Sequence, residues 1–426
     1  MGESLNIFVP HCSDLLTDHL PHGDGLIAHG FLTHLARRGH RLHVAVERVD
    51  VREPLHPNIA IYQIPPPTVG RIFSRIEYML RIRSLFNSLH KIHRFDLIHQ
   101  LNPVFTGLSL SLVGSGLPLV LGTYVARWPD DPDSITSRGN WLRRGLGLGR
   151  GMIAGVQQRN ADAIVLTTPA ARNRLPRPNV VRDRVYMLPH GIDADLFSPE
   201  TGWDSDTRLL EDQANPSILF FANVVPRKGI FTLIDAFRAV AQECPNALLR
   251  IAGDGSALAE VKRQVAGFNC AGRIEFLGRQ ERTAAPRLYR NSSIYCLPSH
   301  GEPYATTVLE AMSCGRPIVV TEGGGLPYMV HERGGKRVPV GDPVLLAKAL
   351  LDLLRDPSQR IAMGRYNRKL VETTMTWENV VRQLEEIYRE TLRRAVSTRR
   401  GQHRREMRIL ETPSVSEVQE LSLIHI

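Results

Sequence analysis

Residues 299–317 read SHGEPYATTVLEAMSCGRP, and this stretch decides the fold of the chain. A short apolar run at 294–297 precedes it, and a second apolar run at 318–321 follows it. We predict two buried strands joined by a loop and one short helix. Gly315 ends this helix, because glycine readily adopts the left-handed conformation found there.

Two carboxylates stand within this stretch, with Glu302 expected in the loop and Glu310 on the helix. Ligands of open α/β sheets bind at the carboxyl ends of the strands, which is where this loop would lie. Glu302 and Glu310 are therefore candidate ligand-binding residues. A second interpretation is open, because Thr307 and Glu310 also fit a capping box in which Glu310 serves only the start of its own helix.

Composition is that of a globular protein with two domains. The chain has 426 residues, of which 42% are apolar and 23% are charged. Such a length predicts two domains of roughly 200 residues each. The formal charge of +10 indicates anionic partners such as phosphates or an acidic membrane face. Nucleic acid is not expected, because no nucleic-acid-binding module or basic-aromatic platform is found.

The cysteines and the first residues indicate a cytoplasmic protein. The five cysteines are widely spaced and contain no Cys-x-x-Cys pair, as expected of reduced core residues. The apolar run at 5–10 is too short for a signal peptide and predicts a first strand.

Strands alternate with helices through both halves, which indicates parallel sheets. The predicted fold class is α/β, with two Rossmann-like domains facing a cleft. We expect an N-terminal domain over 1–190, a linker over 191–215 and a C-terminal domain over 216–375. A final helix over 376–393 would cross back to the first domain. The basic tail, 394–426, is expected to be disordered or to touch a membrane.

Two segments raise the question of a membrane. Residues 100–126 carry no charge, but proline and glycine interrupt them, so we favour a buried strand, a helix over 105–112 and a second strand. Residues 71–94 alternate basic and apolar side chains, and a second basic patch follows at 141–155. The segment 71–94 is either a domain helix with one solvated face or an amphipathic helix on anionic lipid.

Several motifs together resemble one enzyme family. They are the Glu-x7-Glu pair at 302 and 310, its continuation Glu-Ala-Met-x-x-Gly-x-Pro, the run Gly323-Gly324-Gly325-Leu326-Pro327 and the segment 186–197. In this order they resemble the retaining glycosyltransferases of family 4, which have the GT-B architecture. The resemblance spans roughly residues 5–390 and is clearer in the second half.

The resemblance implies roles for particular residues in binding a nucleotide sugar. Glu302, beside the donor sugar, and Lys228, on the phosphates, are the candidate catalytic residues. The candidate nucleotide-sugar-binding residues are Glu310 on the ribose, Gly25, Gly324 and Gly325 near phosphate, Arg279 near the base, and Arg227. The family carries an arginine five or six residues before the lysine; here Ala222 and Asn223 stand there, and Arg227 is expected to supply the charge.

Two further departures from the family pattern lie in the first domain and in the interdomain signature at 186–197. Family members often have a histidine after the strand aligned with 119–121, where this chain has Gly122-Thr123-Tyr124. The usual asparagine before Gly-Ile-Asp is replaced by His190. The missing histidine puts the acceptor-side catalytic assignment in doubt.

No metal and no cofactor is expected. The Asp-x-Asp pairs are read as solvated turns; they are Asp131/Asp133, Asp193/Asp195 and Asp204/Asp206. No His/Cys cluster indicates zinc. The sequence therefore predicts a metal-independent, retaining transfer of a sugar from a UDP- or GDP-linked donor. The acceptor would be a glycan, lipid-linked or other molecule of cell-envelope or polysaccharide synthesis.

Two alternatives to this function remain. One is a degenerate protein of the same architecture that binds a nucleotide sugar or a membrane partner without transfer. The other is a nucleotide-sugar epimerase of the same architecture, which needs no acceptor. In each case the expected location is the cytoplasm, with peripheral contact at the inner face of an anionic membrane as an option.

Overall fold

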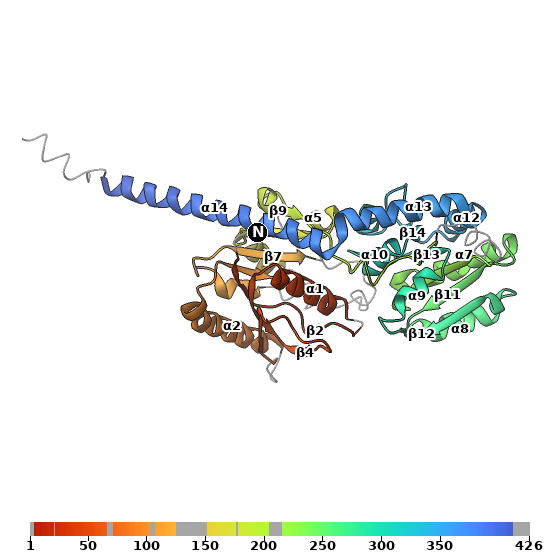
Figure 1. The fold of residues 1–426 in the computed structure, drawn as a ribbon, viewed down its shortest axis with the longest axis horizontal. Coiled ribbons are helices and arrows are strands. Elements are labelled where there is room, and N and C mark those ends of the chain that lie inside the picture. The colour runs from red at the N-terminus through yellow and green to blue at the C-terminus, as the bar shows by residue number, and fades with distance from the viewer. Residues whose placement is uncertain are drawn as a thin grey trace, which may run out of the picture.

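The computed structural model describes residues 4–20, 22–65, 71–102, 107–124, 151–175, 178–203 and 215–411. It contains two α/β domains that lie side by side along the long axis of the molecule (Figure 1). Each has its own parallel sheet, and the predicted fold class is confirmed.

The N-terminal domain is built on a seven-stranded parallel sheet of order β5-β3-β1-β6-β7-β8-β9. Its strands are β1 (Asn6–Val9), β3 (Arg41–Val46), β5 (Ile59–Gln63), β6 (Leu97–Gln100), β7 (Leu119–Tyr124), β8 (Ala163–Leu166) and β9 (Val185–Met187). A separate parallel pair joins β2 (Leu15–Thr17) to β4 (Arg48–Asp50). The order places β1 third in the sheet, between β3 and β6, with later strands added on both sides.

The C-terminal domain has a six-stranded parallel sheet of order β12-β11-β10-β13-β14-β15. Its strands are β10 (Ser217–Phe221), β11 (Leu248–Ala252), β12 (Ile274–Gly278), β13 (Ile294–Leu297), β14 (Ile318–Thr321) and β15 (Gly335–Val338). The strand order reverses between β10 and β13. In open α/β sheets such a switch point opens a crevice at the carboxyl ends of the strands.

Helices and short helical turns connect these strands. In the first domain they are α1 (Gly23–Arg37), α2 (Arg71–His93), η1 (Leu108–Leu112), α5 (Pro169–Arg172) and η2 (Arg182–Arg184), and residues 151–159 are also helical. In the second they are η3 (Pro226–Lys228), α7 (Ile230–Glu243), α8 (Leu258–Ala266), η4 (Ala271–Arg273), α9 (Ala285–Arg290), α10 (Thr306–Ser313), α11 (Leu326–Met329) and α12 (Pro343–Arg355). The chain continues with α13 (Pro357–Leu370), a π-helical turn η5 (Val371–Met375) and α14 (Trp377–Glu411).

Alternation along β1 gives the first sheet two buried faces, because successive side chains of a strand point to opposite sides. Ile7 and Val9 pack in one cluster with α1 and α14. Phe8 packs on the other side, with side chains of α2. The last helix of the chain is therefore part of the core of the first domain.

The uncharged segment at 100–126 forms sheet structure, as predicted. β6 and β7 pair in parallel, and the expected helix appears as η1, a 3-10 helix over 108–112. Residues 103–106 and 125–126 lie outside the described residues. Among the helices that the structure describes, none is both long enough and apolar enough to cross a membrane.

The chain passes between the domains at residues 191–197, the first crossing, and again at residues 371–377, the second crossing. The two crossings are hydrogen-bonded to each other. The Ile192 N–H donates to the Met375 carbonyl at 3.0 Å, and the Trp377 N–H donates to the Ile192 carbonyl at 3.3 Å. Trp377 packs closely over two glycines: a β-carbon added at Gly30 or Gly191 would lie within 2.4 Å of its ring. The two crossings thus form one joint, closed by an aromatic side chain.

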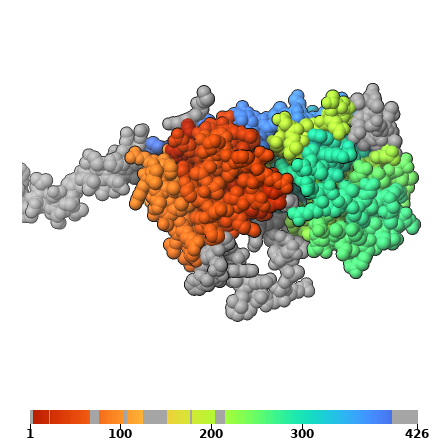
Figure 2. Space-filling model, turned by 60° about the horizontal axis from the view of Figure 1, so that its bottom comes forward, coloured from red at the N-terminus to blue at the C-terminus, as the bar shows by residue number. Residues whose placement is uncertain are grey.

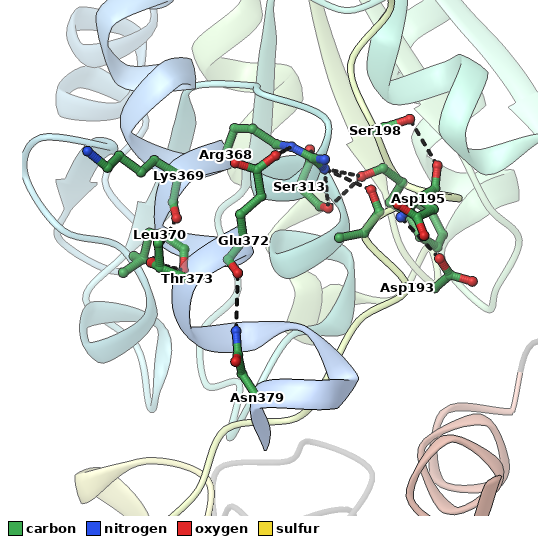
Figure 3. Close-up of polar contacts among 12 residues, drawn as sticks. Asp193, Asp195, Ser198, Ser313, Arg368, Lys369, Leu370, Glu372, Thr373 and Asn379 are labelled. Atoms are coloured by element: carbon green, nitrogen blue, oxygen red, sulfur yellow. Dashed lines mark hydrogen bonds and ion pairs between the residues drawn. The ribbon is translucent and has the colours of Figure 1, made fainter. Parts of the chain in front are cut away.

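Arg368 holds the first crossing against the C-terminal domain (Figure 3). Its guanidinium donates to the carbonyls of Ala194 at 2.8 Å, Phe197 at 3.1 Å and Ser313 at 3.0 Å. Because Ser313 ends α10, the first crossing is fixed to the helix that carries Glu310. Asp193, one of the predicted solvated Asp-x-Asp turns, accepts from the N–H groups of Asp195 and Leu196.

The last helices differ from the prediction at two points. α13 was not predicted; it begins at Pro357, where the Asp356 carboxylate caps the Gln359 N–H at 2.8 Å. The final helix was expected to end at 393, with a disordered tail after it, but α14 continues to Glu411. Arginine favours helices, and the i,i+4 ion pair between Glu390 and Arg394 supports this extension. Residues 412–426 lie outside the described residues.

Figure 2 shows the two lobes in contact, with part of the C-terminal segment along their upper edge. A buried carboxylate fastens this segment to the first domain. Glu385 on α14 accepts from Arg38 Nε at 2.6 Å and Nη2 at 2.9 Å, and His40 Nε2 lies 3.1 Å from it. Burial alone would raise the pKa of Glu385, but the bonds from Arg38 and His40 outweigh it and lower that pKa.

Replacing Glu385 by Gln is expected to lower the free energy of unfolding by about 1–3 kcal/mol, because Arg38 and His40 lose a buried anion. The folded-state pKa of Glu385 lies below its ordinary value of 4.5. Its charge therefore stabilises the fold above this value, and the contribution is lost as pH falls through the folded-state pKa. Urea unfolding at several pH values should show the difference between wild type and Glu385→Gln shrinking below about pH 4.

Glu378 provides a matched control on the same helix. It also accepts from Arg38, but its side chain is 62% exposed. Exposed ion pairs contribute less than about 1 kcal/mol, so Glu378→Gln should unfold almost as wild type does. Equal losses in the two variants would show that the buried pair does not anchor α14.

Candidate functional site

The loops at the switch point of the second sheet bring the two predicted catalytic residues together. Lys228 follows β10, and Glu302 follows β13, which is the neighbouring strand. Two backbone-directed bonds join the loops: the His300 N–H and the Ser299 hydroxyl both donate to the Arg227 carbonyl, at 2.8 and 3.0 Å.

Lys228 forms an ion pair with Glu302 in this position. Arg227 adds a second cation: its Nη1 lies 3.4 Å from Glu302 Oε2 and donates to the Gly301 carbonyl at 3.0 Å. Glu302 is 7% exposed, so water screens these charges weakly. The loops therefore hold two cations and one carboxylate at the edge where a ligand of such a sheet binds.

The glycine run after β14 packs directly against the Glu302 loop. The Gly325 N–H donates to the Glu302 carbonyl at 2.7 Å, and Gly324 pairs with Glu302 as an isolated bridge. A β-carbon at Gly325 would lie 2.1 Å from the Pro303 carbonyl oxygen, and Gly324 has a φ of +70°. Side chains are excluded from these positions, so backbone groups of 323–325 lie beside Glu302.

Glu310 lies on α10, the helix that follows the Glu302 loop, and its carboxylate faces two donors. It accepts from the Tyr289 hydroxyl at 2.7 Å, and Arg282 Nη1 lies 3.4 Å from it. Burial raises the pKa of Glu310, and Arg282 and Tyr289 oppose this effect. The capping-box interpretation of Glu310 is wrong, because α10 begins after Ala305 and no side chain caps it.

Arg282 is a residue of this site that sequence reasoning missed. Arg282 contacts Glu310 and lines a cavity between the two domains, here called the cleft cavity. The predicted Arg279 is exposed in the bend after β12 and does not line this cavity. The two arginines are three positions apart in one loop. In the sequence, both arginines are equally plausible ligand-binding residues. The path of the loop determines that Arg282 is the one that faces Glu310.

A cavity of about 270 Å³ lies between the domains beside Glu310. Side chains of both domains line it. They include His34 and Arg37 of α1, Asp193 of the first crossing, Trp377, Arg282 and Glu310. Lys228 and Glu302 are not among its lining residues, so the described residues form two neighbouring subsites.

Gly25 lies in the first turn of α1, and its N–H donates to the His22 ring at 3.1 Å. A β-carbon there would lie 2.1 Å from the Leu15 carbonyl, so the glycine is required by packing. Gly23, two residues earlier, lines the cleft cavity while Gly25 does not. The start of α1 thus reaches the cleft, although the Gly25 donor is already engaged within the chain.

In the described parts of the chain, one group of His, Asp and Glu is close enough to share an ion. His11, Asp14 and Glu47 each place one ligand atom within 4.8 Å of the others, after β1 and β3. His11 Nε2 lies 3.3 Å from a carboxylate oxygen of Asp14, and this hydrogen bond lowers the pKa of Asp14. The pairs Asp131/Asp133 and Asp204/Asp206 lie outside the described residues.

Two positions that depart from the family pattern, 123 and 190, are in contact. His190 Nε2 lies 3.2 Å from Thr123 Oγ1, and both side chains are buried. The His190 ring also packs on Tyr304, with centroids 4.6 Å apart. Tyr304 follows Glu302 by two residues, so His190 contacts the loop that carries Glu302.

Each half of the chain matches a family model of glycosyltransferases. The family described as Glycosyltransferase Family 4 matches residues 25–196, and Glycosyl transferases group 1 matches residues 203–370. One relative is the N-acetyl-alpha-D-glucosaminyl L-malate synthase of Bacillus anthracis, 24% identical over 87% of this chain and 94% of its own length.

A second relative is the GDP-mannose-dependent monoacylated alpha-(1-6)-phosphatidylinositol monomannoside mannosyltransferase of Corynebacterium glutamicum. It is 31% identical over 45% of this chain and 52% of its own length.

Solved structures share the fold at low identity. The Anabaena protein HepE in complex with UDP has a TM-score of 0.70 and 16% identity, over 91% of this chain and 100% of that one. Sucrose-phosphate synthase from Thermosynechococcus elongatus has a TM-score of 0.69 and 19% identity, over 91% and 99%. With both domains matched in order, the chain belongs to the group 1, family 4 glycosyltransferases of the GT-B fold.

Proposed function

We propose that this chain is a retaining hexosyltransferase that takes its sugar from a nucleoside-diphosphate donor, UDP- or GDP-linked. The observation that carries the proposal is the cluster of Lys228, Arg227 and Glu302 at the switch point of the second sheet. The relatives support a nucleotide sugar as donor, since HepE binds UDP-glucose and the corynebacterial relative is GDP-mannose-dependent.

The reaction requires stabilisation of two developing charges. The bond between the anomeric carbon and the phosphate oxygen breaks, and the acceptor oxygen bonds to that carbon. The acceptor proton passes to the departing phosphate, and a nucleoside diphosphate is released. Fixed cations in a weakly screened cleft stabilise the departing diphosphate, the role we assign to Lys228 and Arg227.

Carboxylates and backbone groups complete the proposed donor site. Glu302 faces the sugar, where its charge stabilises an oxocarbenium-like centre, and Glu310 accepts from the ribose hydroxyls. The backbone of Gly324 and Gly325 lies beside Glu302 and is suited to the phosphates. Retention follows in this proposal if the acceptor attacks the face from which the diphosphate leaves. We propose no metal and no cofactor for this chemistry.

The acceptor is proposed to be a glycan or lipid-linked molecule at the inner face of an anionic membrane. Helix α2 supports this part of the proposal, because apolar and basic side chains share its exposed surface. Ile76, Leu80 and Ile92 are 53%, 64% and 74% exposed, and Arg81 and Lys91 are exposed beside them. Exposed apolar and basic side chains of this kind can contact anionic lipid, although they do not form one apolar stripe along α2.

Thermal unfolding with UDP, GDP, ADP and their sugars will identify the donor. One nucleotide, at a hundred times its dissociation constant, is expected to stabilise the protein by roughly 2.7 kcal/mol. The shift should be lost in Lys228→Ala and reduced in Glu310→Gln. Lys369, an exposed lysine of α13, provides the control, because Lys369→Ala should keep the shift (Figure 3). A wild-type protein that no nucleotide stabilises would contradict the donor site.

Turnover of the donor so identified separates transfer from its alternatives. Glu302→Gln is expected to lower kcat by about 100-fold or more, because the carboxylate acts on the charged transition state. Release of nucleoside diphosphate should depend on an added sugar acceptor. Release without acceptor, together with a new sugar epimer, would identify an epimerase, and binding without any turnover would identify a degenerate protein.

Sedimentation with lipid vesicles tests the membrane contact. Wild-type protein should bind vesicles that contain phosphatidylglycerol, more weakly at high salt, and should not bind pure phosphatidylcholine. Leu80→Ser with Ile92→Ser should weaken this binding several-fold, since about 25 cal/mol per Å² of apolar burial is lost. Val344→Ser is the control, because Val344 is 75% exposed on the other domain. Equal binding by all these proteins would contradict a contact through α2.

A further inference from the structure

Two neighbouring strands of the first sheet bring three side chains with metal-binding atoms together. His11 and Asp14 follow β1, Glu47 comes directly after β3, and the two strands pair in parallel. Each of the three residues places one ligand atom within 4.8 Å of those of the other two. None of them belongs to the proposed donor site. The cluster is therefore a second group of polar side chains whose role is open.

The backbone holds the two carboxylates of this cluster next to each other. Asp14 comes directly before β2 and Glu47 directly before β4, and these strands pair with Leu15 opposite Arg48. The Arg48 N–H also donates to the Asp14 carbonyl at 3.2 Å. Two carboxylates fixed in this way repel each other. The charge of Arg48 acts on both, although within the described ranges its exposed side chain forms an ion pair with neither.

The His11 ring has the orientation of a metal-bound histidine. The residue is 1% exposed, and its ring packs against that of Tyr78 with centroids 6.2 Å apart. Its Nδ1 lies 3.3 Å from the Asn102 carbonyl oxygen, and because a carbonyl only accepts, Nδ1 carries a proton. Nε2, the other ring nitrogen, lies 3.3 Å from a carboxylate oxygen of Asp14. At metal sites one ring nitrogen commonly donates to such a carbonyl while the other binds the ion.

Two species can separate Nε2 from the carboxylates. With Nδ1 protonated, a neutral ring would direct the lone pair of Nε2 at the lone pairs of Asp14. A second proton on the ring removes this repulsion, but it bridges Nε2 to one carboxylate and leaves the two carboxylates facing each other. A divalent cation relieves both repulsions at once, because Nε2 and both carboxylates can bind the same ion.

We propose that His11, Asp14 and Glu47 bind one divalent transition-metal ion, Zn²⁺ or Mn²⁺. One imidazole and two carboxylates form a ligand set of such ions, whereas Mg²⁺ and Ca²⁺ prefer oxygen ligands alone. The side chain of Asp14 is 65% exposed, so water can complete the coordination. The ion fastens the β2–β4 pair to the end of the first sheet. It has no step in the proposed sugar transfer, and the inference does not rest on that function.

Calorimetric titration with the metal alone tests the proposal. The full-length protein is treated with EDTA, transferred to metal-free buffer and titrated with ZnCl₂ or MnCl₂. Loss of an outer partner of a metal-bound histidine costs about 10–100-fold in affinity. Loss of a ligand in Glu47→Gln or His11→Gln is therefore expected to weaken binding of the ion by about 100-fold or more.

Asp50→Asn is the matched control for Glu47→Gln. Asp50 lies on β4, three residues after Glu47, and its carboxylate is 3.7 Å from a different histidine, His19. This variant loses the same formal charge from the same part of the fold and should bind the ion as wild type does. Equal weakening in both variants would show a response to net charge alone and overturn the proposal. Unchanged affinity in Glu47→Gln would overturn it as well.

Thermal unfolding gives a second readout, which is needed because His11 is buried and its substitution affects folding as well. In EDTA, Glu47→Gln should unfold at or above the wild-type temperature, because one of two repelling carboxylates is gone. In Zn²⁺ or Mn²⁺ the order should reverse, because only the wild-type protein is stabilised by binding the ion. The same order in both solutions, or no stabilisation of wild type by either ion, would leave His11 and Asp14 as a proton-bridged pair and overturn the proposal.

Discussion

Close approach of backbone to backbone is the constraint on which the proposed donor site depends. A β-carbon at Gly229 would lie 1.8 Å from the Pro298 carbonyl oxygen, and one at Gly323 would lie 2.7 Å from that of His300. No side chain fits between these segments, so glycine is required on each side of the Glu302 loop. Three loops from neighbouring strands consequently meet with little freedom, and the charges of Lys228 and Glu302 are held where the sheet opens.

The second constraint is the joint between the domains. Residues 191–197 and 371–377 cross together, and Arg368 and Trp377 fix the joint to the C-terminal and N-terminal domains respectively. His190 stands at one end of this joint and contacts the loop of the opposite domain through Tyr304. Rotation of one domain against the other would therefore alter the environment of His190.

Sequence reasoning predicted what local patterns determine. Alternating apolar runs indicated the two parallel sheets, and the strand-loop-helix-strand order placed Glu302 at the carboxyl edge of one of them. The family resemblance singled out Lys228, which the structure brings beside Glu302. It failed where long-range packing decides. Arg282 rather than Arg279 reaches Glu310 because of the path of one loop, and the Arg-rich end of α14 is helical although its apolar pattern fades. The contact between positions 123 and 190 links segments that the sequence keeps far apart.

The placement of α14 has a consequence for how the chain acquires its structure during synthesis. Side chains of this last helix, among them Val381, Leu384 and Tyr388, complete the core of the first domain. A ribosome releases the chain from its N-terminus onward, and domains made first usually fold first. One apolar face of the first sheet is covered only by α1 until residues near 390 emerge. The core of the domain translated second extends to Val371, so that domain is the first that can close its core.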